Sequence, residues 1–248
     1  MRPFARVCAE DIAYFETLMP GRALSGEAIG EDYDHDEMTE YGHFAPEAVL
    51  RALSTDEVSA VLRYCNGRNI AVTPRGAGTG LCGGCVAVDG GILLSTEKMK
   101  RVIEVDVNNM TATVEPGVLL MEFPKALEGT GLFYPPDPGE KTATMGGNAM
   151  TNAGGMRAVR YGVTRDYILG MEVVSADGEV LNLGGKNVKN SSGYSLLDLL
   201  IGSEGTLAFL TKLTVRLVPE PRVNLSLLIP FDDLDRCIEA VPAILGCG

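Results

Sequence analysis

A glycine-rich segment, Thr-Pro-Arg-Gly-Ala-Gly-Thr-Gly-Leu-Cys-Gly-Gly at residues 73–84, directly follows the short apolar run at residues 69–72. Glycine has no Cβ atom, so such a chain can adopt positive φ repeatedly and turn successive N–H groups toward one concavity. Clustered N–H groups of this kind bind anions. The segment is therefore predicted to be a phosphate-binding loop.

The type of phosphate loop is decided by the residues that come after the glycines. Gly78, Gly80 and Gly83 match the spacing G-x-G-x-x-G of dinucleotide-binding folds. That fold needs a helix between the glycines and the next strand. Here residues 84–90 contain two glycines and an Asp-Gly turn signal, and the apolar run at 91–97 comes at once. A Walker A loop is excluded because no Gly-Lys-Ser/Thr is present. We expect a phosphate nest in an irregular loop between two strands, with an unliganded glycine-rich turn as the alternative.

Three further segments contain polar residues, glycines or prolines that could contact a cofactor. Residues 133–138 (Phe-Tyr-Pro-Pro-Asp-Pro) are rigid and extended and end near a carboxylate, or serve only as a linker. Residues 142–155 offer hydroxyls, amides and two Gly-Gly pairs that suit a second wall around a polar cofactor; the alternative is a turn with a short helix. In residues 202–206, Glu204 between glycines either accepts a hydrogen bond from a ribose or adenine or closes a turn.

The cysteines and histidines are the remaining candidates for redox chemistry or metal binding. Cys82 and Cys85 have C-x-x-C spacing, but no second pair and no following helix complete a zinc or redox motif. We expect two small residues in a tight loop, with a labile disulfide as the alternative. The acidic stretch at 31–40 begins like an EF-hand and then places Glu37 and His43 where the turn glycine and the bidentate glutamate belong. It is therefore interpreted as a solvated or capping segment, and no metal site is predicted.

Composition restricts the class of protein. The chain has 248 residues, 46% of them hydrophobic, which is ample for a core, and its net charge of −12 argues against nucleic-acid binding. No apolar stretch approaches the length of a membrane span, and no signal-type segment follows residue 6. These features predict a soluble, cytoplasmic protein.

Both helices and strands are predicted around these loops and must position them. Ser54 and Glu57 form a capping box that opens an amphipathic helix, which Asn66 and Gly67 end. Strands are predicted at 91–97, 101–106, 111–115 and 206–218, and a hairpin at 168–176 and 179–183. Helices are predicted at 119–128, despite Pro124, and at 195–201. Because strands and helices do not alternate steadily, the fold class is α+β.

Five segments in this order resemble the FAD-binding domain of the vanillyl-alcohol oxidase or p-cresol methylhydroxylase-type flavoproteins, most closely the branch that holds D-lactate dehydrogenase and the flavoprotein subunit of glycolate oxidase. They are residues 74–81, 135–138, 145–155, 160–166 and 202–207. The resemblance implies a PCMH-type fold of two α+β subdomains and noncovalent FAD. Its implied cofactor-binding residues are Pro74, Arg75, Gly76, Ala77, Gly78, Thr79, Gly80, Leu81, Pro136, Asp137, Thr144, Met145, Gly146, Gly147, Asn148, Asn152, Gly154, Gly155, Tyr161, Gly162, Glu204 and Gly205.

Within that set, the resemblance implies that main-chain N–H groups from Arg75 to Leu81 hold the pyrophosphate and that Glu204 lies near the adenosine. Tyr161 and Gly162 would lie toward the isoalloxazine. Cys82 and Cys85 depart from the family, where small residues are usual.

The resemblance also implies a function. A hydride passes from the α-carbon of a small D-2-hydroxy acid, of D-lactate or glycolate type, to flavin N5, and the electrons pass to a separate acceptor such as an electron-transfer flavoprotein or a partner oxidase subunit. The expected domains are an N-terminal helical and acidic extension (1–44), the FAD-binding domain (45–221) and the incomplete start of a substrate domain (222–248), with its first strand at 223–230 and its first helix at 231–245. No catalytic residue is assigned in this chain, and family metal ligands are expected outside it. A stand-alone FAD-binding electron-transfer subunit is the alternative.

Overall fold

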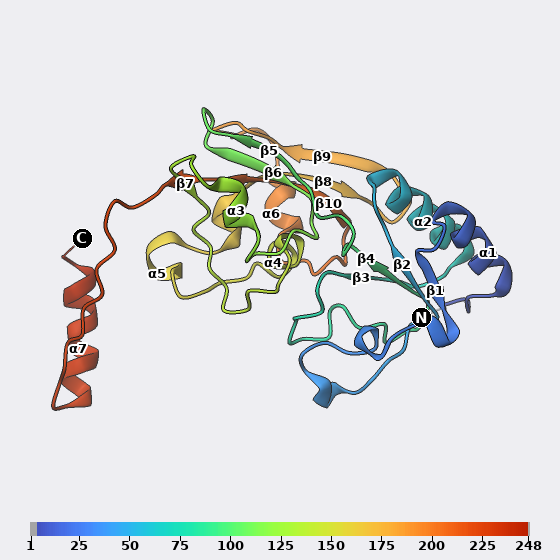
Figure 1. The fold of residues 1–248 in the computed structure, drawn as a ribbon, viewed down its shortest axis with the longest axis horizontal. Coiled ribbons are helices and arrows are strands. Elements are labelled where there is room, and N and C mark those ends of the chain that lie inside the picture. The colour runs from blue at the N-terminus through green and yellow to red at the C-terminus, as the bar shows by residue number, and fades with distance from the viewer. Residues whose placement is uncertain (1–3, 248) are drawn as a thin grey trace.

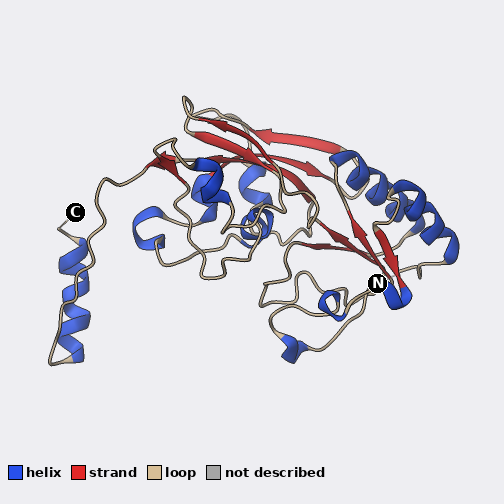
Figure 2. Ribbon diagram, viewed as in Figure 1, coloured by secondary structure: helices blue, strands red, loops and turns tan. Residues whose placement is uncertain are grey.

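The computed structural model describes residues 4–247, which build two main sheets and one short one (Figures 1 and 2). The first sheet has the order β1 (Ala23–Ser25), β2 (Ala48–Arg51), β4 (Ile92–Ser95), β3 (Val72–Arg75). The second has the order β5 (Val102–Asp106), β6 (Thr111–Val114), β10 (Phe209–Arg216), β8 (Ile168–Val174), β9 (Val180–Gly184). The short sheet pairs β7 (Leu132–Phe133) with β11 (Val218–Pro219). This architecture confirms the predicted α+β class.

In the first sheet, β2, β4 and β3 are parallel and β1 pairs antiparallel with β2. β4 is buried along its whole length, as parallel strands covered by helices are. Helices α1 (Ala9–Leu18) and α2 (Thr55–Arg68) lie beside this sheet (Figure 1). Phe15 and Met19 share a core with the buried face of α2. Residues 9–25 thus pack with the first sheet, and the domain boundaries remain a prediction.

Helix α2 begins as the sequence predicts, because the Ser54 side chain accepts a hydrogen bond from Glu57 N at 3.3 Å. It continues through Arg68 and ends at Asn69, whose φ of 55° is left-handed, two residues beyond the predicted end.

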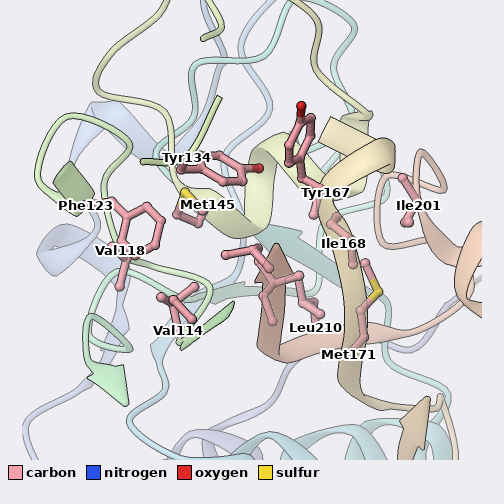
Figure 3. Packing of buried hydrophobic residues seen from close by; sticks show 14 of the residues in the cluster. Val114, Val118, Phe123, Tyr134, Met145, Tyr167, Ile168, Met171, Ile201 and Leu210 are labelled. Carbon is pink, nitrogen blue, oxygen red and sulfur yellow. The ribbon is translucent and has the colours of Figure 1, made fainter. Parts of the chain in front are cut away.

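The second sheet is antiparallel throughout, and its hairpin of β8 and β9 turns at Gly178, as predicted. Its covered face meets helices α3 (Phe123–Leu127), α4 (Met145–Thr151) and α6 (Leu196–Leu200), while α5 (Ala158–Tyr161) lies further out (Figure 1). Figure 3 shows the core between them, where Leu210 of β10, Met145 of α4 and Tyr134 point toward one another.

Several predicted elements differ in extent. The helix at 119–128 is only α3, because Pro124 occupies its first turn and Leu119 instead forms a β-bridge with Thr144. The strand before the glycine segment reaches Arg75, so the irregular loop begins at Gly76. Residues 223–230 form no strand, whereas helix α7 (Leu234–Leu245) is present and lies apart from the two main sheets (Figure 1). Across residues 4–247, no helix combines the length and apolar character required to span a bilayer.

Candidate cofactor-binding site

A cleft of about 370 Å³ lies where three glycine-rich segments meet. Residues 74–85 follow β3, residues 143–153 contain α4, and residues 204–210 lead into β10. The predicted binding residues among its walls are Pro74, Arg75, Gly76, Ala77, Gly78, Thr79, Gly80, Leu81, Thr144, Gly146, Gly147, Asn148, Glu204 and Gly205. Segments far apart in the sequence are thereby brought to one site.

The glycine loop presents unpaired main-chain donors to this cleft. Within residues 4–247, the N–H groups of residues 77–82 have no hydrogen-bond acceptor. Backbone N–H groups rarely remain unpaired unless water or a ligand accepts from them. No helix follows the loop before β4, as the sequence predicts. Consecutive free donors in a concave loop are the arrangement that binds an anion.

The Arg75 side chain points away from the ligand side of the loop. Its Nη1 donates to His35 O at 2.8 Å and to Cys85 O at 3.3 Å, and its Nη2 donates to Asp32 O. Only 7% of the residue is exposed. It is the only basic residue among the described residues that line the cleft. An anion here would therefore be held chiefly by main-chain dipoles, while Arg75 fixes the loop from behind.

Helix α4 supplies the second wall. Its N-cap, Thr144, accepts a hydrogen bond from Gly147 N at 3.0 Å. A Cβ on Gly76 would lie 2.6 Å from Thr144 Oγ1, so glycine is required where the two walls meet. Asn148 is 5% exposed, and its Nδ2 has no acceptor within the described residues. A buried amide donor without a partner is costly, and a ligand oxygen in the cleft would satisfy it.

Glu204 lies on the third side of the cleft, and its backbone conformation is strained. Its φ of 54° lies in the left-handed region, which is uncommon for a non-glycine residue and often marks a functional position. A Cβ on Gly84 would overlap the Glu204 carboxylate, and one on Gly205 would overlap Pro74. The carboxylate therefore lies directly over the end of the glycine loop, where it can accept hydrogen bonds from ligand hydroxyls.

This strain can be measured with two variants that both remove the carboxylate. We expect Glu204→Gly to be about 1 kcal/mol more stable than Glu204→Ala, because glycine adopts positive φ without steric cost. Urea unfolding of the two variants measures the difference. Equal unfolding free energies would contradict the strain.

The other predicted residues lie outside the cleft lining: Pro136, Asp137, Met145, Asn152, Gly154, Gly155, Tyr161 and Gly162. Asp137 pairs with Lys141 and Arg157, and Asn152 Oδ1 accepts from Arg165 N at 2.9 Å. Met145 is a core residue, and Gly155 allows close approach to the Asp137 carbonyl. In this structure they do not line the cleft, so their direct contact with a cofactor stays a prediction.

The cleft also contains residues that the sequence did not predict to bind the cofactor. They are Cys82, Gly84, Cys85, Thr96, Pro116, Pro138, Glu140, Ala143, Met150, Thr151, Ala153, Ala208, Phe209 and Leu210. Most of them are close in sequence to predicted residues. Thr96 and Pro116 are not, and they follow strands β4 and β6, which the sheets bring to the cleft. Only the pairing of β3 with β4 and the contact of Gly146 with Pro116 place them here.

The structure distinguishes between the alternatives for two sets of reactive groups. Cys82 and Cys85 are both free thiols, and burial raises the pKa of the Cys85 thiol although Arg75 nearby lowers it. A neutral thiol fits the packing interpretation rather than redox chemistry. The acidic stretch is not simply solvated, because Asp36 is 3% exposed and its Oδ2 accepts from Gly83 N at 2.7 Å. Asp36 therefore caps the glycine loop, a contact that the interpretation as a solvated or capping segment did not specify.

Comparison with known proteins decides the family. A family model described as a FAD-binding domain matches residues 46–184. The chain belongs to the PCMH-type family of FAD-binding domains. It is 50% identical over 239 residues to D-lactate dehydrogenase of Anaerostipes hadrus, covering 96% of this chain and 50% of that protein. It is 43% identical over 215 residues to glycolate oxidase subunit GlcD of Bacillus subtilis (strain 168), covering 86% of this chain and 46% of that protein.

A comparison with solved structures supports the assignment of this fold at lower sequence identity. A solved structure of alkyldihydroxyacetonephosphate synthase matches with a TM-score of 0.77 at 21% identity, covering 90% of this chain and 42% of that one. The chain spans about half the length of the curated relatives it matches.

The residues of the cleft fit FAD. The free N–H groups of residues 77–82 suit the pyrophosphate, and Glu204 suits ribose hydroxyls. The unpaired Asn148 Nδ2 suits a phosphate or ring oxygen. Ala208, Phe209 and Leu210 give one side of the cleft the apolar surface that an aromatic ring system requires.

Proposed function

We propose that this chain supplies the FAD-binding part of an oxidoreductase that oxidises a small D-2-hydroxy acid. The observation that carries the proposal is the run of free N–H groups at residues 77–82 within a cleft built from three glycine-rich segments. The relatives support the substrate class, since they include D-lactate dehydrogenase and, in Danio rerio at 41% identity, D-2-hydroxyglutarate dehydrogenase.

In this proposal the chain binds and orients the cofactor. When bound, FAD supplies hydride acceptance, a reaction that amino-acid side chains cannot perform. The glycine loop neutralises the pyrophosphate through main-chain dipoles, so the binding needs no lysine. Asn148 donates its buried Nδ2, and the apolar residues at 208–210 exclude water from the ring system. Neither histidine lines the cleft, so this chain offers no imidazole base to the substrate there.

The test begins with flavin binding. The purified chain is mixed with FAD, passed through gel filtration and examined by absorption, with FMN as the matched control that lacks adenosine. We expect FAD to be retained and FMN to be lost. Loss of both flavins would refute the cofactor assignment.

Substrate oxidation is tested anaerobically on the FAD-loaded chain and on a chimera that adds the second half of the Anaerostipes hadrus relative. We expect D-lactate, but not L-lactate, to bleach the flavin of the chimera only. Bleaching of the chain alone would contradict the view that oxidation requires groups outside this chain. A chimera that dithionite reduces but no D-2-hydroxy acid reduces would refute the substrate class.

A further inference from the structure

The two histidines of this chain meet at one carboxylate oxygen outside the cofactor cleft. His35 Nδ1 lies 2.8 Å and His43 Nδ1 lies 2.7 Å from Asp34 Oδ1. One potential ligand atom from each of the three residues lies within 4.8 Å of the others. The side chain of His43 is 57% exposed and that of His35 is 29% exposed, so solvent reaches the cluster.

The main chain holds these side chains together independently of their own contacts. Phe44 N donates to Asp34 O at 2.7 Å, which closes residues 34–44 into a loop. Asp36 accepts from Met38 N within the loop and from Gly83 N of the glycine loop. Arg75 donates to the carbonyl of His35. The cluster therefore sits on a loop that is anchored at several points to the buried side of the cofactor site.

Two imidazoles and one carboxylate form a ligand set that suits Zn²⁺ and similar divalent transition metals. We propose that Asp34, His35 and His43 bind one such ion, with Zn²⁺ as the representative, and that water occupies the fourth position. Ligand atoms bound to a tetrahedral ion at about 2.0–2.2 Å lie roughly 3.3–3.5 Å apart. For an ion to enter, the two imidazole nitrogens, now 2.8 and 2.7 Å from Asp34 Oδ1, move away from that oxygen to the separation that the ion sets. The acidic residues of the same stretch attract the cation.

This site differs from the two metal motifs weighed from the sequence. An EF-hand would use carboxylates in a fixed twelve-residue order, which Glu37 and His43 break. A cysteine site would use Cys82 or Cys85, which lie in the glycine loop. The proposed ion instead uses two imidazole nitrogens and one carboxylate oxygen and braces the loop of residues 34–44.

The proposal is tested by titrating Zn²⁺ into the chelator-treated chain in a calorimeter. We expect one ion per chain, and at least tenfold weaker binding in Asp34→Asn, His35→Gln and His43→Gln. Glu40→Gln, an exposed acid of the same stretch, and Cys82→Ser, an exposed thiol, are the matched controls and should bind Zn²⁺ as the unmodified chain does. Thermal unfolding without metal verifies that each variant is folded.

A second readout distinguishes nitrogen from sulfur ligands. Co²⁺ bound at this site should give visible bands without thiolate charge-transfer absorption, and Zn²⁺ should raise the melting temperature of the unmodified chain but not that of His43→Gln. The proposal is overturned if the chain binds no stoichiometric Zn²⁺, if His43→Gln binds as tightly as the unmodified chain, or if Cys82→Ser abolishes binding. In the first of these cases, the cluster is a hydrogen-bonded clamp alone.

Discussion

Gly78→Ala is expected to weaken FAD binding by at least a hundredfold, a loss of about 2.7 kcal/mol. Gly78 is buried in the glycine loop with a φ of 80°. A Cβ at this position would overlap the Arg75 guanidinium, which is itself held by main-chain carbonyls and cannot move aside without breaking those bonds. The backbone must then shift, and the N–H groups of residues 77–82 lose their common direction.

Gly83→Ala is the matched control for this prediction. Gly83 lies in the same loop with a φ of 72°, and a Cβ there meets no atom within 4 Å. Both variants carry the cost of a left-handed alanine, about 1–2 kcal/mol, so the difference between them isolates the overlap with Arg75. Fluorescence quenching of FAD on titration measures both affinities. If the two variants bind FAD equally, the position of Arg75 does not govern the loop.

Local signals made most of the fold predictable. The Ser54 N-cap and the Asp-Gly turn of the hairpin were correctly located because each depends on neighbouring residues. The extent of α3 was wrong, since the bridge between Leu119 and Thr144 is a long-range contact that competes with helix formation. The missing strand at residues 223–230 shows the same limit, because strands form only against a partner.

The cleft was predictable where backbone chemistry marks it and unpredictable where packing does. Glycine spacing alone made the glycine loop and Glu204 candidates for the site, and both line the cleft. No local pattern places Thr96 or Pro116 in the cleft, or turns the Arg75 side chain away from it. The proximity of His43 to Asp34 was not predicted because the turn that returns His43 to Asp34 depends on the 3₁₀ turn at Thr39–Tyr41 and on the Phe44 hydrogen bond.

Arg75→Met is expected to reduce the free energy of unfolding by about 2–4 kcal/mol and to weaken FAD binding together with it. Methionine matches the length of the arginine stem but donates no hydrogen bond. The carbonyl oxygens of Asp32, His35 and Cys85 would lose their donor in a buried setting. The ring of Tyr33, which lies 5.9 Å from the guanidinium carbon, would lose a cation–π contact.

Arg6→Met is the control: it measures the stability lost when an exposed arginine, rather than a buried one, is replaced by methionine. The Arg6 side chain is 83% exposed and pairs with Glu47, so its loss should cost no more than about 1 kcal/mol. Urea unfolding of both variants, with and without FAD, measures the two costs. FAD should stabilise Arg6→Met as much as the unmodified chain and Arg75→Met less, because Arg75, unlike Arg6, joins the segment at residues 32–36 to the strand that carries the glycine loop. Equal stabilisation would mean that the loop keeps its shape without Arg75, and the free N–H groups alone would then define the cofactor site.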